Sequence, residues 1–297
     1  MPLDAEINST KNQLHYDYIA DAWRHLLGEN FHWGYFQEGN EKLEKATVEL
    51  VKLLFKNIRV ASTHHLLDVG CGIGEPARFL FQEYKCSITG ISTSEEGIRR
   101  ACSASEDITD SNKLTFIVRN ALDNGFPDES FDTVFLLEMS HLIRDKIALL
   151  ASSTRVVKIG GTIALCDLTL RRPLSAREIV DRLDEIKLLE RCFGKARLEP
   201  LSYYKQAFSH CGLGEIETQD VTSEVIPTIR HWRSNAEKNR TILLKHIKEK
   251  DIDDFIYSCD ILQKYFDEGI WGYGVITGTK HHATTVTGEN NLSKALF

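Results

Sequence analysis

Residues 66–80 constrain the fold more than any other stretch, because they read as a buried strand, a glycine turn and a helix. The strand is a short apolar run that contains a single acid, Asp68. Three alternate glycines follow it: Gly70, Gly72 and Gly74. Pro76 stands next, and proline is favoured in the first turn of a helix. Such a strand–turn–helix unit predicts a sheet that holds a ligand beyond the ends of its strands.

The spacing of the glycines argues against a dinucleotide. A dinucleotide-binding turn has glycines at its first, third and sixth positions. Counted from Gly70, the sixth position is Glu75, and the third glycine comes one residue early. A carboxylate at the start of a helix also disfavours a pyrophosphate there. A ligand without phosphate therefore fits the turn better, and a nicotinamide-dependent dehydrogenase is the weakest interpretation.

Composition and charge exclude several classes of protein. The chain has 297 residues, enough for one large α/β domain or two small ones. Its net charge of −7 argues against a nucleic-acid surface, and no apolar run approaches the ~20 residues that span a bilayer. The seven cysteines include no C-x-x-C pair, which indicates reduced thiols and neither a disulfide framework nor a metal site. We therefore expect a soluble, cytoplasmic enzyme without a membrane or nucleic-acid partner.

Strand-like and helical segments alternate after the glycine turn, as in α/β domains. We expect helices at 95–104 and 145–157, the second ending in a turn at Gly160-Gly161. Consecutive strand–helix units with right-handed crossovers form a parallel, doubly wound sheet. Beyond the first strand, the expected strands are 87–92, 114–118, 131–137, 162–168, 215–221 and 271–277.

Four regions follow from this pattern. Residues 1–60 are expected to form a helical cover, and residues 61–174 the core that binds the cofactor. Residues 175–280 would supply a helical lid and the last two strands, and the polar residues 281–297 a disordered tail. The expected fold class is α/β, with a doubly wound, seven-stranded sheet between the cover and the lid.

Four short sequence blocks, in their order along the chain, resemble those of the class I S-adenosylmethionine-dependent methyltransferases. They are D-x-G-x-G-x-G from Asp68, G-I-S-x-S from Gly90, the stretch 119–132, and R-V-V-K-I-G-G from Arg155. The second block makes the chain similar to natural-product sugar O-methyltransferases of the rebeccamycin and erythromycin type. The resemblance implies a Rossmann-like methyltransferase fold that uses S-adenosylmethionine and releases S-adenosylhomocysteine.

The resemblance also implies which residues contact the cofactor. The glycines let the backbone approach it, and Asp68 orders the turn. Ser92 stands where the family usually has an acid for the ribose hydroxyls. Asn120, followed by Ala121, stands where an aspartate meets the adenine amino group. Both replacements keep a side-chain oxygen that can form the hydrogen bond.

Two aromatic residues match further elements of the same group. Tyr16 lies in H-Y-D, and Trp33 lies in the segment H-W-G-Y-F that starts at His32. By resemblance both residues cover the cofactor, where an aromatic face attracts a sulfonium. Packing in a hydrophobic core would explain the same residues.

The ends of the fourth and fifth strands supply the candidates for catalysis. A hydroxyl acceptor needs a base, because an alcohol is a poor nucleophile while it keeps its proton. His141 follows the fourth strand and Asp167 lies at the end of the fifth. If these strands are neighbours, the carboxylate can hold the imidazole and stabilise its cation. The sugar O-methyltransferases that this sequence resembles carry such a pair, whereas the simpler alternative is that both residues are caps.

Other charged residues allow further roles. Glu138 would orient the acceptor or contact the positive end of the cofactor, or it would only order its loop. Arginines in or beside the lid could meet an anion such as a diphosphate, although solvated helix faces often carry such charges. They are Arg171, Arg172, Arg177, Arg191, Arg197, Arg230 and Arg233.

We therefore expect methyl transfer to a small-molecule acceptor, with a hydroxyl as the target and His141 as the general base. The nearest alternative is C-methylation or cyclisation of an alkene, polyene or isoprenoid diphosphate, which would use Glu138 or the arginines. A catalytically silent homologue that only binds the cofactor is a third alternative. A homo-oligomer is compatible with the sequence.

Overall fold

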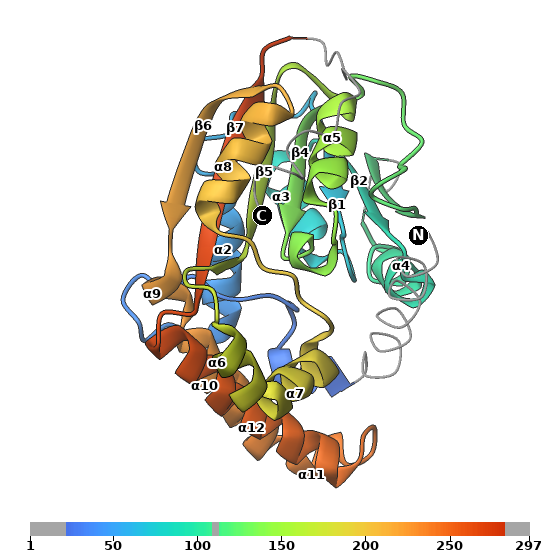
Figure 1. Cartoon of the computed structure of the whole chain (residues 1–297). Coiled ribbons are helices and arrows are strands. Elements are labelled where there is room, and N and C mark those ends of the chain that lie inside the picture. Colours follow the sequence, from blue (N-terminus) through green and yellow to red (C-terminus); the bar gives the residue numbers. More distant parts are fainter. Residues whose placement is uncertain (1–21, 109–112, 283–297) are drawn as a thin grey trace.

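Helices cover both faces of one central sheet, and a second group of helices lies beyond one end of it (Figure 1). The structure, a computed structural model, describes residues 22–108 and 113–282. Seven strands form the sheet in the order β3-β2-β1-β4-β5-β7-β6. The expected seven-stranded α/β fold is therefore confirmed.

Strands β1 to β5 pair in parallel, as the crossovers predict. Strand β7 lies between β5 and β6 and is antiparallel to both, so the sheet is mixed. The expectation of a parallel sheet is wrong at β7, because the chain leaves β6 and enters β7 at the same end of the sheet. Three strands, β2 to β4, have the bounds expected from the sequence. The strands are β1 (His65–Val69), β2 (Ser87–Ser92), β3 (Leu114–Val118), β4 (Phe131–Leu137), β5 (Val157–Leu170), β6 (Leu213–Asp220) and β7 (Trp271–Lys280).

Alternate residues of β1 belong to two separate cores, one on each face of the sheet. Leu66 lies in the core under α2 and α3, and Leu67 lies in the core under α5 and α8. Both leucines are fully buried, because a central strand of a sheet that is covered on both sides is apolar on both sides. The helices that flank the sheet are α2 (Leu43–Phe55), α3 (Glu75–Tyr84), α4 (Glu95–Ser103), α5 (Lys146–Val156) and α8 (Leu201–His210).

Strand β5 begins earlier than the sequence pattern predicts. The predicted turn at Gly160-Gly161 is wrong, because α5 ends at Val156 and β5 already starts at Val157. Gly160 has a φ of +77°, and the register between β4 and β5 shifts beside it. A side chain at Gly161 would lie 2.6 Å from the carbonyl oxygen of Asp132. The two glycines therefore permit an irregularity inside the strand and do not end the helix.

Helices from two parts of the chain form the group beyond the end of the sheet, which we call the lid (Figure 1). Helix α7 packs on α12, and α12 packs on α10. Helix α8 lies within the region expected to be lid, yet it packs on β6 and β7 beside α5. The division into cover, core, lid and tail otherwise stays a prediction. The lid helices are α6 (Ala176–Asp181), α7 (Leu183–Phe193), α10 (Pro227–Lys238), α11 (Arg240–Leu243) and α12 (Glu249–Asp267), with the short α9 (Thr222–Val225) before α10.

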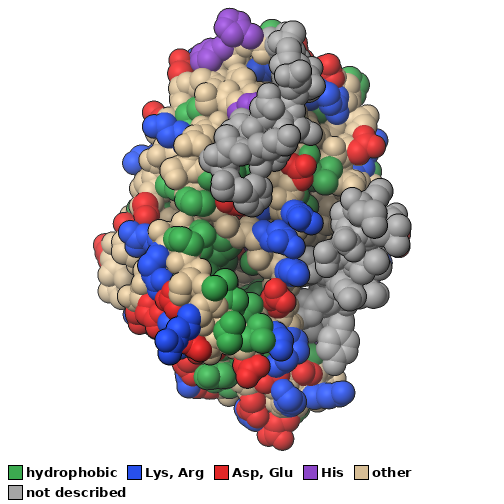
Figure 2. Space-filling view, viewed as in Figure 1, with side chains coloured by type: hydrophobic (Ala, Val, Ile, Leu, Met, Phe, Trp, Pro, Cys, Tyr) green, Lys and Arg blue, Asp and Glu red, His purple; other side chains and the backbone are tan. Residues whose placement is uncertain are grey.

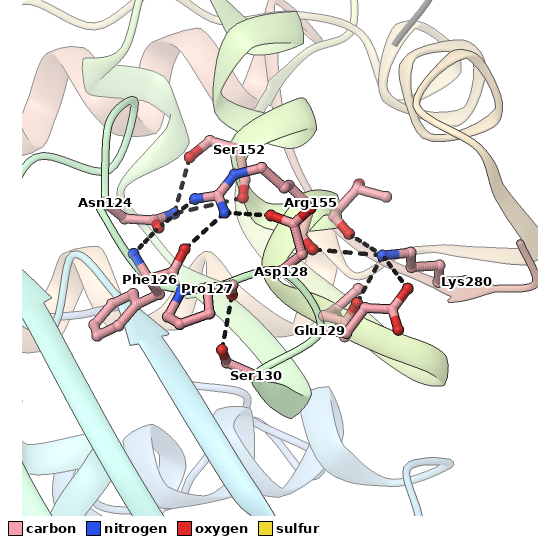
Figure 3. A network of polar contacts seen from close by, with 11 residues as sticks. Asn124, Phe126, Pro127, Asp128, Glu129, Ser130, Ser152, Arg155 and Lys280 are labelled. Atoms are coloured by element: carbon pink, nitrogen blue, oxygen red, sulfur yellow. Dashed lines mark hydrogen bonds and ion pairs between the residues drawn. The ribbon is translucent and has the colours of Figure 1, made fainter. Parts of the chain in front are cut away.

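The stretch 119–132 and the block that starts at Arg155 meet at the amino-terminal end of β4 (Figure 3). Arg155, near the end of α5, donates to the carbonyl of Phe126 at 2.6 Å. Its guanidinium also reaches Asp128 Oδ1 at 2.7 Å and Asn124 Oδ1 at 2.9 Å. These contacts hold the loop before β4 against α5. They lie at the end of the sheet opposite the carboxyl ends of β1 to β4.

Lys280, at the end of β7, contacts the same region between the loop before β4 and the end of α5 (Figure 3). Its ammonium donates to the carbonyls of Thr154 and Val157, each at 2.9 Å, and lies 3.7 Å from Glu129. The side chain is almost fully buried. Lys280 therefore satisfies carbonyls that the end of α5 leaves without a helical partner.

The substitution Lys280→Met is expected to lower the free energy of unfolding by about 2–4 kcal/mol, because buried carbonyls would lose their donor. Lys205→Met, on the exposed side of α8, is the matched control and should change stability by less than about 0.5 kcal/mol. Urea unfolding measures both. Equal stabilities of the two variants would contradict the role of Lys280.

Candidate active site

The carboxyl ends of β1, β4 and β5 meet at one edge of the sheet. In the sheet β4 lies between β1 and β5, so the condition on which the His141–Asp167 hypothesis depended is met. Leu137 pairs with Cys166, and the N–H of Glu138 donates to the Cys166 carbonyl at 2.9 Å. The sheet therefore places Asp68, Glu138 and Asp167 at the edge where such folds bind ligands.

The glycine turn after β1 combines close packing with one open position. All three glycines have positive φ, +82° at Gly70, +53° at Gly72 and +78° at Gly74. A side chain at Gly70 would lie 2.6 Å from Met139, and one at Gly74 would lie 2.6 Å from the ring of Phe116. At Gly72 an added Cβ would meet no described atom within 4 Å. Gly70 and Gly74 are thus required by packing, whereas Gly72 leaves its backbone open to a ligand.

Asp68 is a buried carboxylate with an unsatisfied oxygen. Its side chain is 1% exposed, and its Oδ2 has no hydrogen-bond partner among the described residues. Burial raises the pKa of Asp68 from 3.8 to about 8. An uncompensated buried acid is costly, so this position suits a ligand that brings a cationic N–H donor or another positive charge.

Glu138 is tied to two distant segments. Its Oε1 accepts from the backbone N–H of Trp33 at 2.8 Å and from the hydroxyl of Tyr273 at 2.6 Å. Its φ is +52°, a conformation that a non-glycine residue adopts rarely. Burial raises the pKa of Glu138 to about 8, although both hydrogen bonds act in the opposite direction. Glu138 therefore joins the segment around Trp33, β4 and β7.

The ring of Trp33 packs in a cluster of aromatic side chains. Its centroid lies 4.9 Å from Trp232, 5.3 Å from Phe266 and 6.2 Å from Tyr273. The residue is 4% exposed. This environment supports the packing alternative, and a contact with the cofactor stays a prediction. The expected contact of Tyr16 lies outside the described residues.

The expected ribose and adenine positions form small turns. Ser92 Oγ accepts from the N–H of Ser94 at 3.2 Å. Asn120 Oδ1 accepts from the N–H of Leu122 at 2.9 Å, and Ala121 between them is 9% exposed. The oxygen of Asn120 therefore already orders its own turn, and its role toward adenine, like that of Ser92 toward ribose, stays a prediction.

His141 and Asp167 form a close pair. Nδ1 of His141 lies 2.7 Å from Oδ1 of Asp167. Because a carboxylate can only accept, Nδ1 carries the proton and the lone pair of the neutral ring lies on Nε2. The alternative that His141 caps the following helix is wrong, because Asp145 fills that place and accepts from the N–H of Ala148 at 2.9 Å.

Asp167 stays ionised although it is fully buried. Burial alone would raise its pKa, but the charge of His141 and hydrogen bonds from His141 and Ser140 hold the pKa of Asp167 below its ordinary value. The backbone N–H groups of His141 and Leu168 also donate to it, at 2.9 and 2.8 Å. A buried carboxylate with this many donors can orient an imidazole and stabilise its protonated form.

Most of the arginines proposed to meet an anion are paired with acids. Red and blue side chains are interspersed over the lid in Figure 2, as expected for solvated faces that carry both charges. Arg197 contacts the site through its backbone, whose N–H donates to the carbonyl of His141 at 2.7 Å. The ion pairs join Arg171 to Asp220, Arg172 to Glu178, Arg177 to Asp181, Arg191 to Asp254 and Arg233 to Asp260, while Arg230 donates to the carbonyl of Gly39.

Several residues of the site carry no signal that the sequence analysis used. Tyr273 was assigned only to a strand and Lys146 only to a helix, and Ser140, which precedes His141, was given no role. Tyr204 was assigned only to a helix, yet its hydroxyl lies 2.8 Å from Ser140 Oγ. Their roles depend on contacts between distant segments, which local spacing does not report.

The described residues contain no group of three or more acidic, cysteine or histidine side chains that could hold a metal ion. None of the helices in residues 22–108 and 113–282 is long and apolar enough to cross a bilayer.

Comparison with known proteins gives a family and related folds. The family described as mycolic acid cyclopropane synthetase matches residues 4–271. The chain is 28% identical over 266 residues to 27-O-demethylrifamycin SV methyltransferase of Amycolatopsis mediterranei (strain S699), which covers 89% of this chain and 95% of that protein.

Two solved structures share the fold. The mycolic acid cyclopropane synthase CmaA1 complexed with SAH and CTAB has a TM-score of 0.81 at 19% identity, covering 91% of this chain and 98% of that one. The cyclopropane synthase MmaA2 from Mycobacterium tuberculosis has a TM-score of 0.80 at 16% identity, covering 90% and 96%.

The variants Gly72→Ala and Gly74→Ala should separate ligand binding from packing. Gly74→Ala is expected to lower the free energy of unfolding by about 2 kcal/mol or more, because its methyl group would meet the ring of Phe116. Gly72→Ala should cost only about 1 kcal/mol of backbone strain, yet weaken binding of S-adenosylhomocysteine about tenfold or more. Thermal unfolding and calorimetric titration measure the two effects. Unchanged binding of S-adenosylhomocysteine to Gly72→Ala would contradict the hypothesis that the ligand approaches the backbone at Gly72.

Proposed function

The chain belongs to the mycolic acid cyclopropane synthetase family, and on this premise we propose that it transfers a methyl group to a hydroxyl of a small natural product, with His141 as the general base. It is an S-adenosylmethionine-dependent methyltransferase, as the four sequence blocks predicted. The observation that carries the proposal is the pair of His141 and Asp167 at the carboxyl ends of two neighbouring strands.

S-adenosylmethionine supplies a methyl group on a sulfonium that is already activated for displacement. The residues after β1 fit such a ligand, because among the described residues none packs against an added Cβ at Gly72 and none donates to the buried Oδ2 of Asp68. The amino acid end of the cofactor carries an ammonium, which would satisfy that oxygen. The turn needs no room for a pyrophosphate, in agreement with Glu75 at the start of α3.

His141 would take the proton of the acceptor hydroxyl at Nε2. Its other nitrogen is engaged with Asp167, which fixes the tautomer and stabilises the imidazolium that forms. The side chain of His141 is 13% exposed, so the ring is largely held by the protein while one part stays accessible. The proton returns to solvent from Nε2 after methyl transfer.

The arrangement supports O-methylation over the alternative with Glu138. One oxygen of Glu138 already accepts from Trp33 and Tyr273, so Glu138 joins these two segments. The His141–Asp167 pair, in contrast, offers the base that a hydroxyl acceptor needs. The intact His141–Asp167 pair also supports an active enzyme over a silent homologue.

The test of the proposal is methyl transfer from radiolabelled S-adenosylmethionine to pairs of small glycosides and phenols that differ by one hydroxyl. We expect label in an ether product and no label in the partner that lacks the hydroxyl. Label on carbon, found equally in both members of a pair, would contradict O-methylation.

His141→Ala is expected to lower turnover by about 10²–10⁴-fold, the range that general base catalysis contributes. Affinity for S-adenosylhomocysteine should stay unchanged, because the ring lies at the end of β4 and not in the glycine turn. His210→Ala, on an exposed position of α8, is the control. Initial rates measure turnover, and calorimetry measures affinity. If His141→Ala keeps the turnover of the wild type, His141 is not the general base.

Binding of S-adenosylhomocysteine should strengthen as pH rises toward about 8. The pKa of Asp68 is raised to about 8, so at lower pH the free site is mostly protonated. Because the ligand's ammonium needs the ionised carboxylate, binding must release a proton, and affinity should gain up to about tenfold per pH unit.

Calorimetry in buffers of different ionisation enthalpy measures the released proton. Asp68→Asn should abolish both the proton release and the pH dependence. Affinity that does not change between about pH 6 and 8 in the wild type would contradict this role of Asp68.

A further inference from the structure

We propose that Tyr204 and Ser140 are positioning residues for the base, through a chain of hydrogen bonds that runs from Tyr204 to Ser140 to Asp167. The inference rests on the proposed function of His141 and names groups that act on it without touching substrate. Tyr204 lies on α8 and Ser140 lies in the short helical turn η2 (Ser140–Leu142) after β4.

The direction of each hydrogen bond follows from its partners. Ser140 Oγ lies 2.6 Å from Asp167 Oδ2, and the ionised carboxylate can only accept, so the serine donates. Ser140 has one proton, so its bond with the hydroxyl of Tyr204, at 2.8 Å, must be donated by the tyrosine. The chain therefore delivers two aligned hydroxyl dipoles to the carboxylate, and bonds aligned in this way strengthen one another.

Each oxygen of the Asp167 carboxylate accepts two hydrogen bonds. Oδ1 accepts from the Nδ1 proton of His141 and from the N–H of Leu168. Oδ2 accepts from Ser140 Oγ and from the N–H of His141. With four donors the carboxylate has one fixed orientation, and Oδ1 faces the imidazole. Loss of the serine hydroxyl would leave Oδ2 with a single donor in a fully buried site.

The surrounding elements keep both hydroxyls in place. Tyr204 is 1% exposed, and burial together with the charge of Asp167 raises its pKa well above the ordinary value, so it keeps its proton. The ammonium of Lys146 donates to the carbonyl of Ser140 at 2.7 Å and to that of Ile143, which fixes the turn from α5. On the other side, the N–H of Arg197 holds the carbonyl of His141.

The titratable groups around Asp167 leave few other sources of stabilisation. Burial raises the pKa values of Glu138 at the end of β4, Cys166 on β5 and Tyr273 on β7, so these groups are mainly neutral near pH 7. Lys146 is the cation that faces Asp167 from α5, and burial lowers its pKa to about 8. Arg197 and Glu199, in the connection between α7 and α8, act on Lys146 with opposite signs. Apart from the backbone N–H groups of His141 and Leu168, the ionised form of Asp167 therefore depends on His141, Lys146 and the hydroxyl chain.

The experiment follows the imidazole of His141 by nitrogen NMR in protein labelled with ¹⁵N-histidine, with its signals identified by their loss in His141→Gln. The measurement needs no acceptor. In Tyr204→Phe and Ser140→Ala the carboxylate shares less of its charge with other donors, so it attracts the imidazolium more strongly. The midpoint of titration of the pair should move up by about half a pH unit in Tyr204→Phe and about one unit in Ser140→Ala.

Tyr203→Phe is the matched control, because it removes the neighbouring hydroxyl on the same helix and should leave the midpoint unchanged. The proposal is overturned if the midpoint and the Nδ1–H tautomer in Tyr204→Phe equal those of the wild type while S-adenosylhomocysteine still binds. Should Ser140→Ala fail to fold, Tyr204→Phe decides alone. The proposed function fails separately, if His141→Ala keeps its turnover, whatever the titration shows.

Discussion

A fully buried carboxylate at the end of β5 determines the chemistry of this edge of the sheet. Asp167 cannot stay ionised there without donors, and the fold brings them from β5 itself, from the turn after β4 and, through Ser140, from α8. Such an arrangement is costly to assemble and strongly destabilised if one donor is lost. The same carboxylate accepts the Nδ1 proton of His141 and so fixes the tautomer of that ring. The interaction therefore links the packing of three elements to the orientation of the His141 imidazole.

The parallel sheet places the second half of the site beside the first. Strand β1 ends next to β4, so the glycine turn and Asp68 lie at the same edge as His141. The two acids have opposite environments: Asp167 has four donors in the protein, whereas Oδ2 of Asp68 has none within residues 22–108 and 113–282. This contrast agrees with the proposal that Asp68 meets the cofactor and Asp167 orients the base.

Local patterns in the sequence were sufficient to predict most strands of the sheet and their order along the chain. The apolar runs that became β2, β3 and β4 were short and bounded by turn residues, so their ends could be predicted. Gly160-Gly161 was misjudged, because a glycine pair ends a helix as readily as it permits an irregular strand. Tyr204 and Tyr273 could not be assigned to the site, since each reaches it only through the packing of segments distant in sequence. The ends of the fourth and fifth strands pointed to His141 and Asp167, while the side-chain donors of Asp167 could be found only from the three-dimensional structure.

A crystal structure of the protein with S-adenosylhomocysteine and a methylated product tests the roles of Asp68 and His141 most directly. We expect the ligand's ammonium beside Asp68, its sulfur at the edge between the glycine turn and β4, and the ether oxygen of the product beside Nε2 of His141. A complex in which Nε2 faces away from the product, or in which the ligand leaves the glycine turn empty, would contradict the assignment of both the cofactor site and the base.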